Sequence, residues 1–453
     1  MSFLGIEIAR RSLQAHQRAL TVTAHNIANI NTPGYSRQEA VFQTTTPISY
    51  PSVHSPKPGQ LGTGMMNTEI KRHRDVYLDR QVREAKSAIG YAENMETALQ
   101  RVEAVIPEPS EFGIQAMLGS FFSAWHYLAQ DPENPGSRAA VKGAAEMLAN
   151  SFSMVHDSLT SVKVDLVGVE MDDPSEVDPQ SLFAQQLRDI NAIGKQISEL
   201  NWESAYQRTA GTNPNDLLDR RDRLVEDLAT LADVSVSVSS VDLNLISVSV
   251  YGVQIVDGTQ YLQVGNGFVE LQAEEAREAV TDNTRGALAA TVAAAENIEG
   301  YMGMLRTLME SLTDAVNDRL DAEFFTYENG HMALGEEAMD VLRGVTATQA
   351  WAVAQVREQR VVGDVGGDGE STLDGYYREL ITGIGADLAV AQRGRDNVQA
   401  ILGQIELLRE SVSGVNLDEE LTRMMQYQYG YQAAARVVIM MDDMLDTLIN
   451  RMM

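Results

Sequence analysis

The most constraining feature of this 453-residue sequence is a long run of regularly spaced apolar positions near its C-terminal end. Between residues 417 and 452, eleven positions follow in alternating steps of four and three, and nine are apolar. These steps keep side chains on one face of an α-helix, so the pattern predicts a single helix with an apolar stripe. The stripe must pack on another helix or on the core of its own domain. Its residues include Leu417, Leu421, Met424, Tyr431, Ala435, Val438, Leu445 and Ile449, and Gln428 and Asp442 interrupt it.

A second apolar row lies at the other end of the chain. Ile6, Leu13, Leu20 and Ile27 recur every seven residues and predict a helix. This helix should end near residues 31–34, Asn-Thr-Pro-Gly, because proline cannot continue a helix and glycine permits a turn. Periodicity alone does not identify what covers either row.

Charge separates the two ends from the interior. The net charge is −29, yet residues 1–40 carry +2 and residues 415–453 carry −3, which leaves −28 on the interior. Like charge keeps a surface solvated and discourages self-packing, so the ends are the better candidates for burial against partners. The acidic excess also disfavours nucleic-acid binding, which needs Lys and Arg to neutralise phosphates.

Between the ends, the pattern predicts long helices interrupted by one β-rich segment. Valines alternate with serines from residue 234, and the turn sequences Asp257-Gly258 and Gly265-Asn266-Gly267 predict an antiparallel unit over 233–271. The segment 41–70 should be extended or loop. Helices are expected at about 71–106, 111–130, 135–166, 181–207, 215–231, 286–323 and 371–412, with an acidic connection at 171–179, an irregular piece at 328–330 and a flexible glycine-rich loop at 363–369.

No catalytic or metal-binding motif is evident. The absence of cysteine excludes disulfides, cysteine nucleophiles and thiolate metal sites. The seven histidines include no pair at i and i+4 and no HExxH pattern, and the loop at 363–369 lacks the GK[ST] ending of a phosphate cradle. No stretch reaches the ~18 apolar residues of a membrane span, and the N-terminus does not resemble a cleaved secretory signal. We therefore expect no enzyme, no cofactor and no metal.

Three separated motifs resemble one family, the axial proteins of the bacterial flagellum (rod, hook and hook-associated proteins). The first spans residues 26–38, and its ending Gly-Tyr-Ser-Arg-Gln is similar to hook-associated junction proteins. The second is residues 215–222, Asn-Asp-Leu-Leu-Asp-Arg-Arg-Asp, and the third is residues 413–420, Ser-Gly-Val-Asn-Leu-Asp-Glu-Glu. The motif residues are Asn26, Asn29, Asn31, Thr32, Pro33, Gly34, Tyr35, Asn215, Asp216, Asp219, Arg220, Asp222, Gly414 and Asn416.

The resemblance implies a mainly α fold in which the N- and C-terminal helices pair as an α-helical coiled coil beside a long-helix bundle body. The C-terminal stripe would then face Ile6, Leu13, Leu20 and Ile27. Residues 1–40 and 413–453 would form a terminal assembly domain, and 41–232 with 286–412 a helical body that includes the extended segment 41–70. Residues 233–285 would form an inserted β-rich outer domain.

The resemblance further implies a structural subunit at the junction between hook and filament. The implied partners are other copies in a ring, the hook protein, a second hook-associated junction protein, and an export chaperone that masks the C-terminal helix. The location would be extracellular, after export from the cytoplasm without a cleaved signal. We expect the terminal helices to be disordered in the monomer, because a lone helical stripe is marginal in water. The alternatives are a hook or rod subunit, or a flagellum-associated wall hydrolase with its catalytic residues in 170–370.

Overall fold

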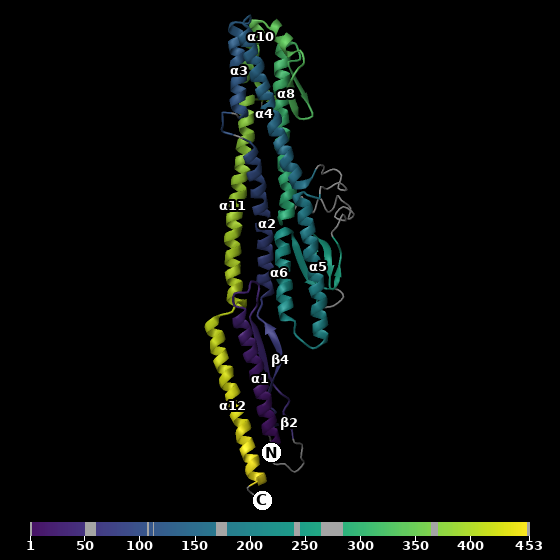
Figure 1. The fold of residues 1–453 in the computed structure, drawn as a ribbon, viewed down its shortest axis with the longest axis vertical. Helices are drawn as coiled ribbons and strands as arrows, with labels where there is room; N and C mark the ends of the chain where they lie inside the picture. Colours follow the sequence, from purple (N-terminus) through teal and green to yellow (C-terminus); the bar gives the residue numbers. More distant parts are fainter. Residues whose placement is uncertain are drawn as a thin grey trace.

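The computed structural model describes residues 2–49, 60–106, 108–111, 113–168, 179–239, 245–263, 284–363 and 370–450. The molecule is elongated, and both termini lie at the same end (Figure 1). Helices dominate, and the small sheets are antiparallel. The terminal helices are in contact with each other. The prediction of a mainly α fold with paired terminal helices is confirmed.

The terminal pair consists of α1 (Ser2–Ala28) and α12 (Leu417–Asn450), which lie side by side at the lower end of Figure 1. The turn after α1 contains Gly34 with a φ of 79°, a left-handed conformation that glycine adopts without strain. The α12 helix is capped by Asn416, whose Oδ1 accepts the backbone N–H groups of Asp418 and Glu419 at 3.0 and 3.3 Å. The start of α12 is therefore set by Asn416 of the third motif, whereas α1 ends at Ala28, before the predicted turn at residues 31–34.

A β-ribbon follows α1 and returns the chain toward the body. It pairs β1 (Gln38–Thr44) with β4 (Met65–Arg72), and a shorter pair joins β2 (Ile48–Ser49) to β3 (Gln60–Leu61). Both β1 and β4 contact α1. The segment 41–70, predicted to be extended or loop, thus contributes strands that pack on α1 beside the α1–α12 pair.

Long helices form the body. They are α2 (Val76–Val105), α3 (Ile114–Gln130), α4 (Pro135–Val167), α8 (Ala287–Leu320) and α11 (Leu373–Ser413). Their shared core contains large, fully buried side chains, among them Trp125, Phe121, Phe152, Phe324 and Tyr376. Short elements close the far end: β9 (Phe325–Glu328), β10 (His331–Leu334), α9 (Ala338–Gly344), α10 (Ala347–Gln355), a 3₁₀ turn (Val356–Glu358), β11 (Arg360–Gly363) and β12 (Glu370–Thr372).

A four-stranded antiparallel meander packs beside the body. Its strands are β5 (Val234–Val238), β6 (Ile246–Val250), β7 (Val253–Asp257) and β8 (Gln260–Tyr261), in that order. The sheet shares one apolar cluster with α5 (Leu182–Thr209), α6 (Asn215–Leu231) and the start of α8. The division into a body and an outer domain stays a prediction.

One sequence expectation is wrong, and others lie outside the described residues. The piece at 328–330 is not irregular but the turn of the β9–β10 hairpin, because Asn329 and Gly330 take φ angles of 51° and 85°. Two positive φ angles at Asn-Gly are typical of a tight hairpin turn. The turn at 265–267, the connection at 171–178 and residues 364–369 of the loop are not described. Among the described residues, no helix combines the length and apolarity that crossing a membrane requires.

Candidate functional site

The three sequence motifs, far apart along the chain, meet where the terminal pair joins the body (Figure 1). We call this place the joint. It comprises residues 26–38, 215–222 and 413–420 with the charged side chains that they contact. The first motif leaves α1 and enters β1, the second begins α6, and the third connects α11 to α12.

Asn26 lies at the centre of the joint and is only 1% exposed. Its Nδ2 donates to the carbonyl of Gln38 at 2.8 Å and to Oε2 of Glu420 at 2.9 Å. Its Oδ1 accepts the hydroxyl of Tyr35 at 2.7 Å and the backbone N–H of Gln38 at 3.0 Å. One amide thus ties α1 to β1 and to a glutamate of α12, and both of its ends are satisfied.

A second polar contact fixes the first motif to α6. The side chain of Gln38 donates to Oδ1 of Asp216 at 2.7 Å, and Asn215 Nδ2 donates to the side-chain carbonyl of Gln38 at 3.2 Å. Asn215 Nδ2 also reaches the carbonyl of Ile70 on β4, at 2.9 Å. The start of α6 is therefore bound to both strands of the ribbon.

Beneath these amides, two arginines pair with carboxylates of α6: Arg72 ends β4, and Arg74 lies in the connection from β4 to α2. Arg72 Nη1 lies 2.7 Å from Oδ1 of Asp219 and 3.1 Å from Oδ2 of Asp222, and Arg74 Nη1 lies 3.0 Å from Oδ2 of Asp222. Asp219 Oδ2 also accepts the backbone N–H of Ser36 at 3.0 Å. These are charge-assisted bonds in a largely buried place, where an unpaired charge would be costly.

Burial and pairing move the pKa values of the two aspartates in opposite directions. Burial raises the pKa of Asp219, although Arg72 and the Ser36 N–H act against it. Burial also acts to raise the pKa of Asp222, but Arg74, Arg221 and Arg72 outweigh it, so the pKa lies below its ordinary value. The ionised form of Asp222 is the one that this network stabilises.

The network continues from the joint into the body. Arg221 is 6% exposed and donates to Oδ1 of Asn201 at 3.2 Å; the Nδ2 of that asparagine donates to the carbonyls of Ile246 and Gly258 in the sheet region. The buried carboxylate of Glu226 forms ion pairs with Lys86 Nζ of α2 at 2.9 Å and with Arg409 Nη1 of α11 at 2.6 Å. Polar contacts therefore couple α6 to α2, α5 and α11.

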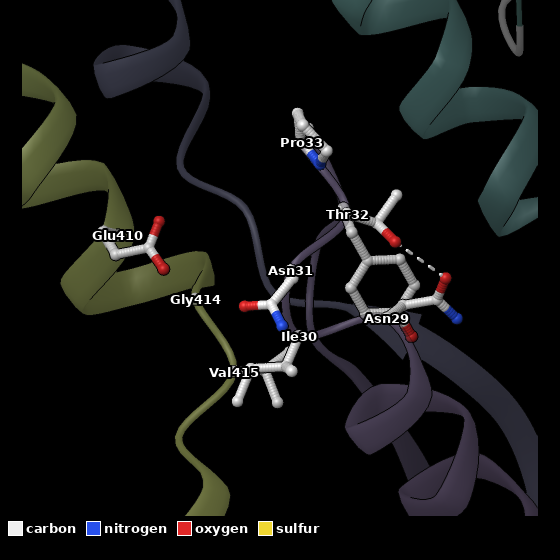
Figure 2. Close-up of a pocket in the computed structure, with 10 residues that line it drawn as sticks. Asn29, Ile30, Asn31, Thr32, Pro33, Glu410, Gly414 and Val415 are labelled. Carbon is white, nitrogen blue, oxygen red and sulfur yellow. Dashed lines mark hydrogen bonds between the residues drawn. The ribbon is translucent and has the colours of Figure 1, made fainter.

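A pocket of about 180 Å³ lies beside the joint, between the turn after α1 and the α11–α12 connection (Figure 2). Figure 2 shows the turn 29–33 facing Glu410 and Val415, with Thr32 Oγ1 donating to Asn29 Oδ1 at 3.1 Å. The backbone N–H of Arg37 donates to the carbonyl of Ser413 at 2.9 Å, which joins the segment after α1 to the end of α11. The lining residues are Asn29, Ile30, Asn31, Thr32, Pro33, Gly34, Tyr35, Glu410, Gly414 and Val415.

The contact row of α12 toward α1 consists of Glu420, Tyr427, Gly430, Ala434 and Met441. Tyr427 packs on the rings of His16 and Phe42, at centroid distances of 6.3 and 5.7 Å. A Cβ at Gly430 would meet the His16 ring, one at Gly5 would meet Met441, and Ala434 is 7% exposed. Small residues at these positions let the two helices approach closely.

The predicted stripe lies beside this contact row, rotated from it by roughly 60° at 3.6 residues per turn. Leu417, Leu421 and Tyr431 are exposed, at 45%, 43% and 38%. The side chain of Ile449 is not described. The remaining stripe residues Met424, Ala435, Val438 and Leu445 are half-buried, as are Ile6, Leu13, Leu20 and Ile27 of α1.

Much of the remaining surface of α12 is also apolar. Five large side chains outside both rows are 52–70% exposed. A helix that is apolar on most sides is normally buried on most sides, and α1 covers only one of them. We define the outer face of α12 as the exposed residues Leu417, Leu421, Met425, Tyr429, Ile439, Met440 and Met444.

Not every motif residue enters the network. Asn31, Thr32, Pro33 and Gly34 are exposed in the turn, and Arg220 is exposed on α6. Sequence reasoning missed several partners of the joint, because they lie in segments without a recognisable motif. Arg72 and Arg74, two close cations in a strongly acidic chain, are the one signal that could have indicated them. The missed residues outside the motifs are Arg72, Arg74 and Glu226, whereas Gln38 and Glu420 lie in the first and third motifs but were given no role.

The chemistry of the joint is that of a structural connection. Asp219, Asp222 and Glu226 already accept from arginine or lysine, so these groups are paired with cations of the chain itself. Asn26, Asn215 and Gln38 use their amides on backbone and side chains of neighbouring elements. This arrangement fixes one helix pair against a long body.

Comparisons with known proteins agree with this geometry. Residues 99–331 match the flagellar hook-associated protein FlgK helical domain. Residues 6–35 match the flagella basal body rod protein family, and residues 410–452 match the C-terminal family of the flagellar basal body rod proteins FlgEFG. The two ends of the chain thus match families of the wider flagellar axial proteins, and the body matches the hook-associated helical domain.

Individual relatives point the same way. The chain is 28% identical to flagellar hook-associated protein 1 of Bacillus subtilis, over 100% of this chain and 98% of that protein. It is 29% identical to the Salmonella typhimurium protein of the same name, over 67% of this chain and 49% of that one. The fold is similar to the flagellar hook junction protein FlgK from Burkholderia pseudomallei, with a TM-score of 0.58 and 12% identity over 74% of this chain and 100% of that one.

The matches distinguish between the alternatives that the sequence left open. A hook or rod subunit would not be expected to match the hook-associated helical domain, and that match covers more than half of the chain. The matched family is structural and not enzymatic. The chain therefore belongs to the family of flagellar hook-associated protein 1, the hook–filament junction protein FlgK.

Proposed function

We propose that copies of this chain assemble into a ring through the terminal pair, with the outer face of α12 packed against the terminal pair of the next copy. The observation that carries this proposal is the apolar outer face, on an element whose sequence matches the flagellar axial family. Burying a large apolar side chain contributes about 1.5–3 kcal/mol, so several such residues per copy supply a favourable term that opposes the free-energy cost of association.

The joint then sets the direction in which the body leaves the ring. Its buried amides and ion pairs are satisfied in one arrangement, and any rotation of the body against the terminal pair would break several of them together. Networks of this kind are costly to leave partly satisfied. The joint therefore favours one fixed angle between the terminal pair and the body, in keeping with an assembly that must present two matched surfaces.

These surfaces have different partners in the proposal. One side of the ring docks on the hook protein, and the other receives a second hook-associated junction protein and then the filament. Before export, a chaperone covers the outer face of α12, which would otherwise expose apolar side chains in the cytoplasm. The protein is a flagellar component, and we place its working location outside the cell.

Deletion of the gene, followed by electron microscopy, tests the proposal. We expect complete hooks without filaments, and unpolymerised flagellin in the medium. Complementation with the natural gene should restore filaments, whereas a variant impaired in the outer face should not. Filaments of normal length on the deletion strain would contradict the junction role.

A further inference from the structure

A group of three potential metal ligands lies in the body, away from the joint. His156 and Asp157 are consecutive on α4, and His331 begins β10 in the hairpin packed against that helix. In Figure 1, α4 lies beside α8 in the upper half of the molecule, far from the terminal pair. We propose that these three side chains form a site for a divalent transition-metal cation of the Zn²⁺ type.

The distances within the group fit a metal site better than a closed hydrogen-bond network. His156 Nδ1 and His331 Nε2 lie 3.7 and 3.6 Å from the same oxygen, Oδ1 of Asp157. These separations are too long for hydrogen bonds. Ligand atoms bonded to a tetrahedral metal at 2.0–2.1 Å are roughly 3.4 Å apart, so the histidine nitrogens need to move only slightly toward the Asp157 oxygen. One ligand atom from each residue lies within 4.8 Å of the others.

The burial of His156 supplies a second, independent observation. The residue is 8% exposed, and its Nδ1 is buried without a hydrogen-bond partner among the described residues. The other edge of the ring is held by the hairpin turn, because a Cβ at Gly330 would collide with Nε2. A buried polar atom without a partner is unfavourable, and a cation between the three ligands would provide that partner.

The ligand set selects the class of cation. Two imidazoles and one carboxylate suit Zn²⁺, Ni²⁺ or Cu²⁺, whereas Ca²⁺ and Mg²⁺ prefer oxygen ligands. Asp157 and His331 are largely exposed, which leaves further coordination positions open to water. A cation here would tie the hairpin to α4 across 175 residues of sequence and stabilise the far end of the body.

The test uses the full chain after treatment with EDTA. Calorimetric titration with Zn²⁺ should show saturable binding of one ion per chain, and Zn²⁺ should raise the melting temperature until EDTA is added. His331→Ala and Asp157→Asn should each weaken binding at least about tenfold. His126→Ala changes an exposed histidine of α3 and should leave binding unchanged.

The variants alter exposed side chains and keep the buried ring, so circular dichroism should show an unchanged fold. Two results would overturn the proposal. One is the absence of saturable Zn²⁺ binding to the natural chain. The other is binding that persists at full strength in both variants, which would place the ion elsewhere.

Discussion

The replacement Asn26→Ala tests whether the joint holds the terminal pair. Removal of this side chain leaves the backbone N–H and carbonyl of Gln38, the carboxylate of Glu420 and the hydroxyl of Tyr35 without their shared partner. Gln38 and Glu420 are 7% and 0% exposed, so water replaces the amide poorly there. Each buried group left unpaired costs about 1–3 kcal/mol, and we expect a total of about 3 kcal/mol after partial rehydration.

That free energy should appear as local opening and not as global unfolding. A loss of about 3 kcal/mol raises the open population of the terminal pair about 100-fold, since each 1.4 kcal/mol is a factor of ten. Hydrogen exchange followed by mass spectrometry measures this directly on the monomer. Protection in the first turns of α12 and the last turns of α1 should fall about 100-fold, while α3 and α4 keep theirs.

The matched control is Asn31→Ala, which removes an exposed asparagine from the neighbouring turn. It should change protection by less than about threefold, as surface substitutions usually do. An equal loss in both variants, or a loss spread over the whole body, would refute the reasoning. Complete absence of protection in the natural monomer would also refute it, and would support the expectation that the terminal helices are disordered before assembly.

Three further predictions address the outer face, the ion network and the packing of the body. Leu421→Asp should give a folded monomer with an unchanged melting temperature that does not restore filaments to a deletion strain; global unfolding would show instead that Leu421 serves the internal core. Asp222→Asn should lower the free energy of unfolding by about 1–2 kcal/mol at pH 7. Because the pKa of Asp222 is lowered in the fold, this difference should shrink as the pH falls below about 4, and a difference that grows there would contradict the assignment. Gly90→Ala should destabilise by about 1–3 kcal/mol despite better helix propensity, because its Cβ would meet the backbone of Thr230. Gly143→Ala has open space and should stabilise by up to about 1 kcal/mol in the same denaturant titration.

The sequence predicted the helices well where their ends are chemically marked. The break between α11 and α12 falls at Gly414, as expected from the sequence, whereas α1 ends at Ala28, before the predicted end near residues 31–34. The hairpin at Asn329-Gly330 was missed because its strands are only four residues long and follow a long helix. Short strands carry too few alternating positions to give a clear period.

The contact face of α12 was harder to predict for a physical reason. Hydrophobic periodicity identifies the most apolar side of a helix, but this helix is apolar on several sides. Gly430 and Ala434 are small residues on the side of α12 that faces α1, and small residues contribute little to an apolar stripe. The expectation that the stripe faces Ile6, Leu13, Leu20 and Ile27 of α1 therefore stays a prediction.

The joint illustrates a different limit. Its motifs were visible only through the resemblance, and the partners Arg72 and Glu226 carry no spacing signal. Long-range polar contacts such as Asn26 to Glu420, which are 394 residues apart, cannot be deduced from local pattern. The same holds for His156 and His331, whose proximity depends on how the hairpin docks on α4.

The most direct measurement of the central claim is labelling of the outer face before and after assembly. The chain contains no cysteine, so Met440→Cys introduces a single thiol at a site that is 54% exposed in the monomer. A maleimide should react rapidly with the monomer and at least about tenfold more slowly in isolated hook–filament junctions, while Glu133→Cys on the body stays reactive. Equal reactivity of Met440→Cys in the monomer and in the assembled junction would contradict burial of α12 between copies.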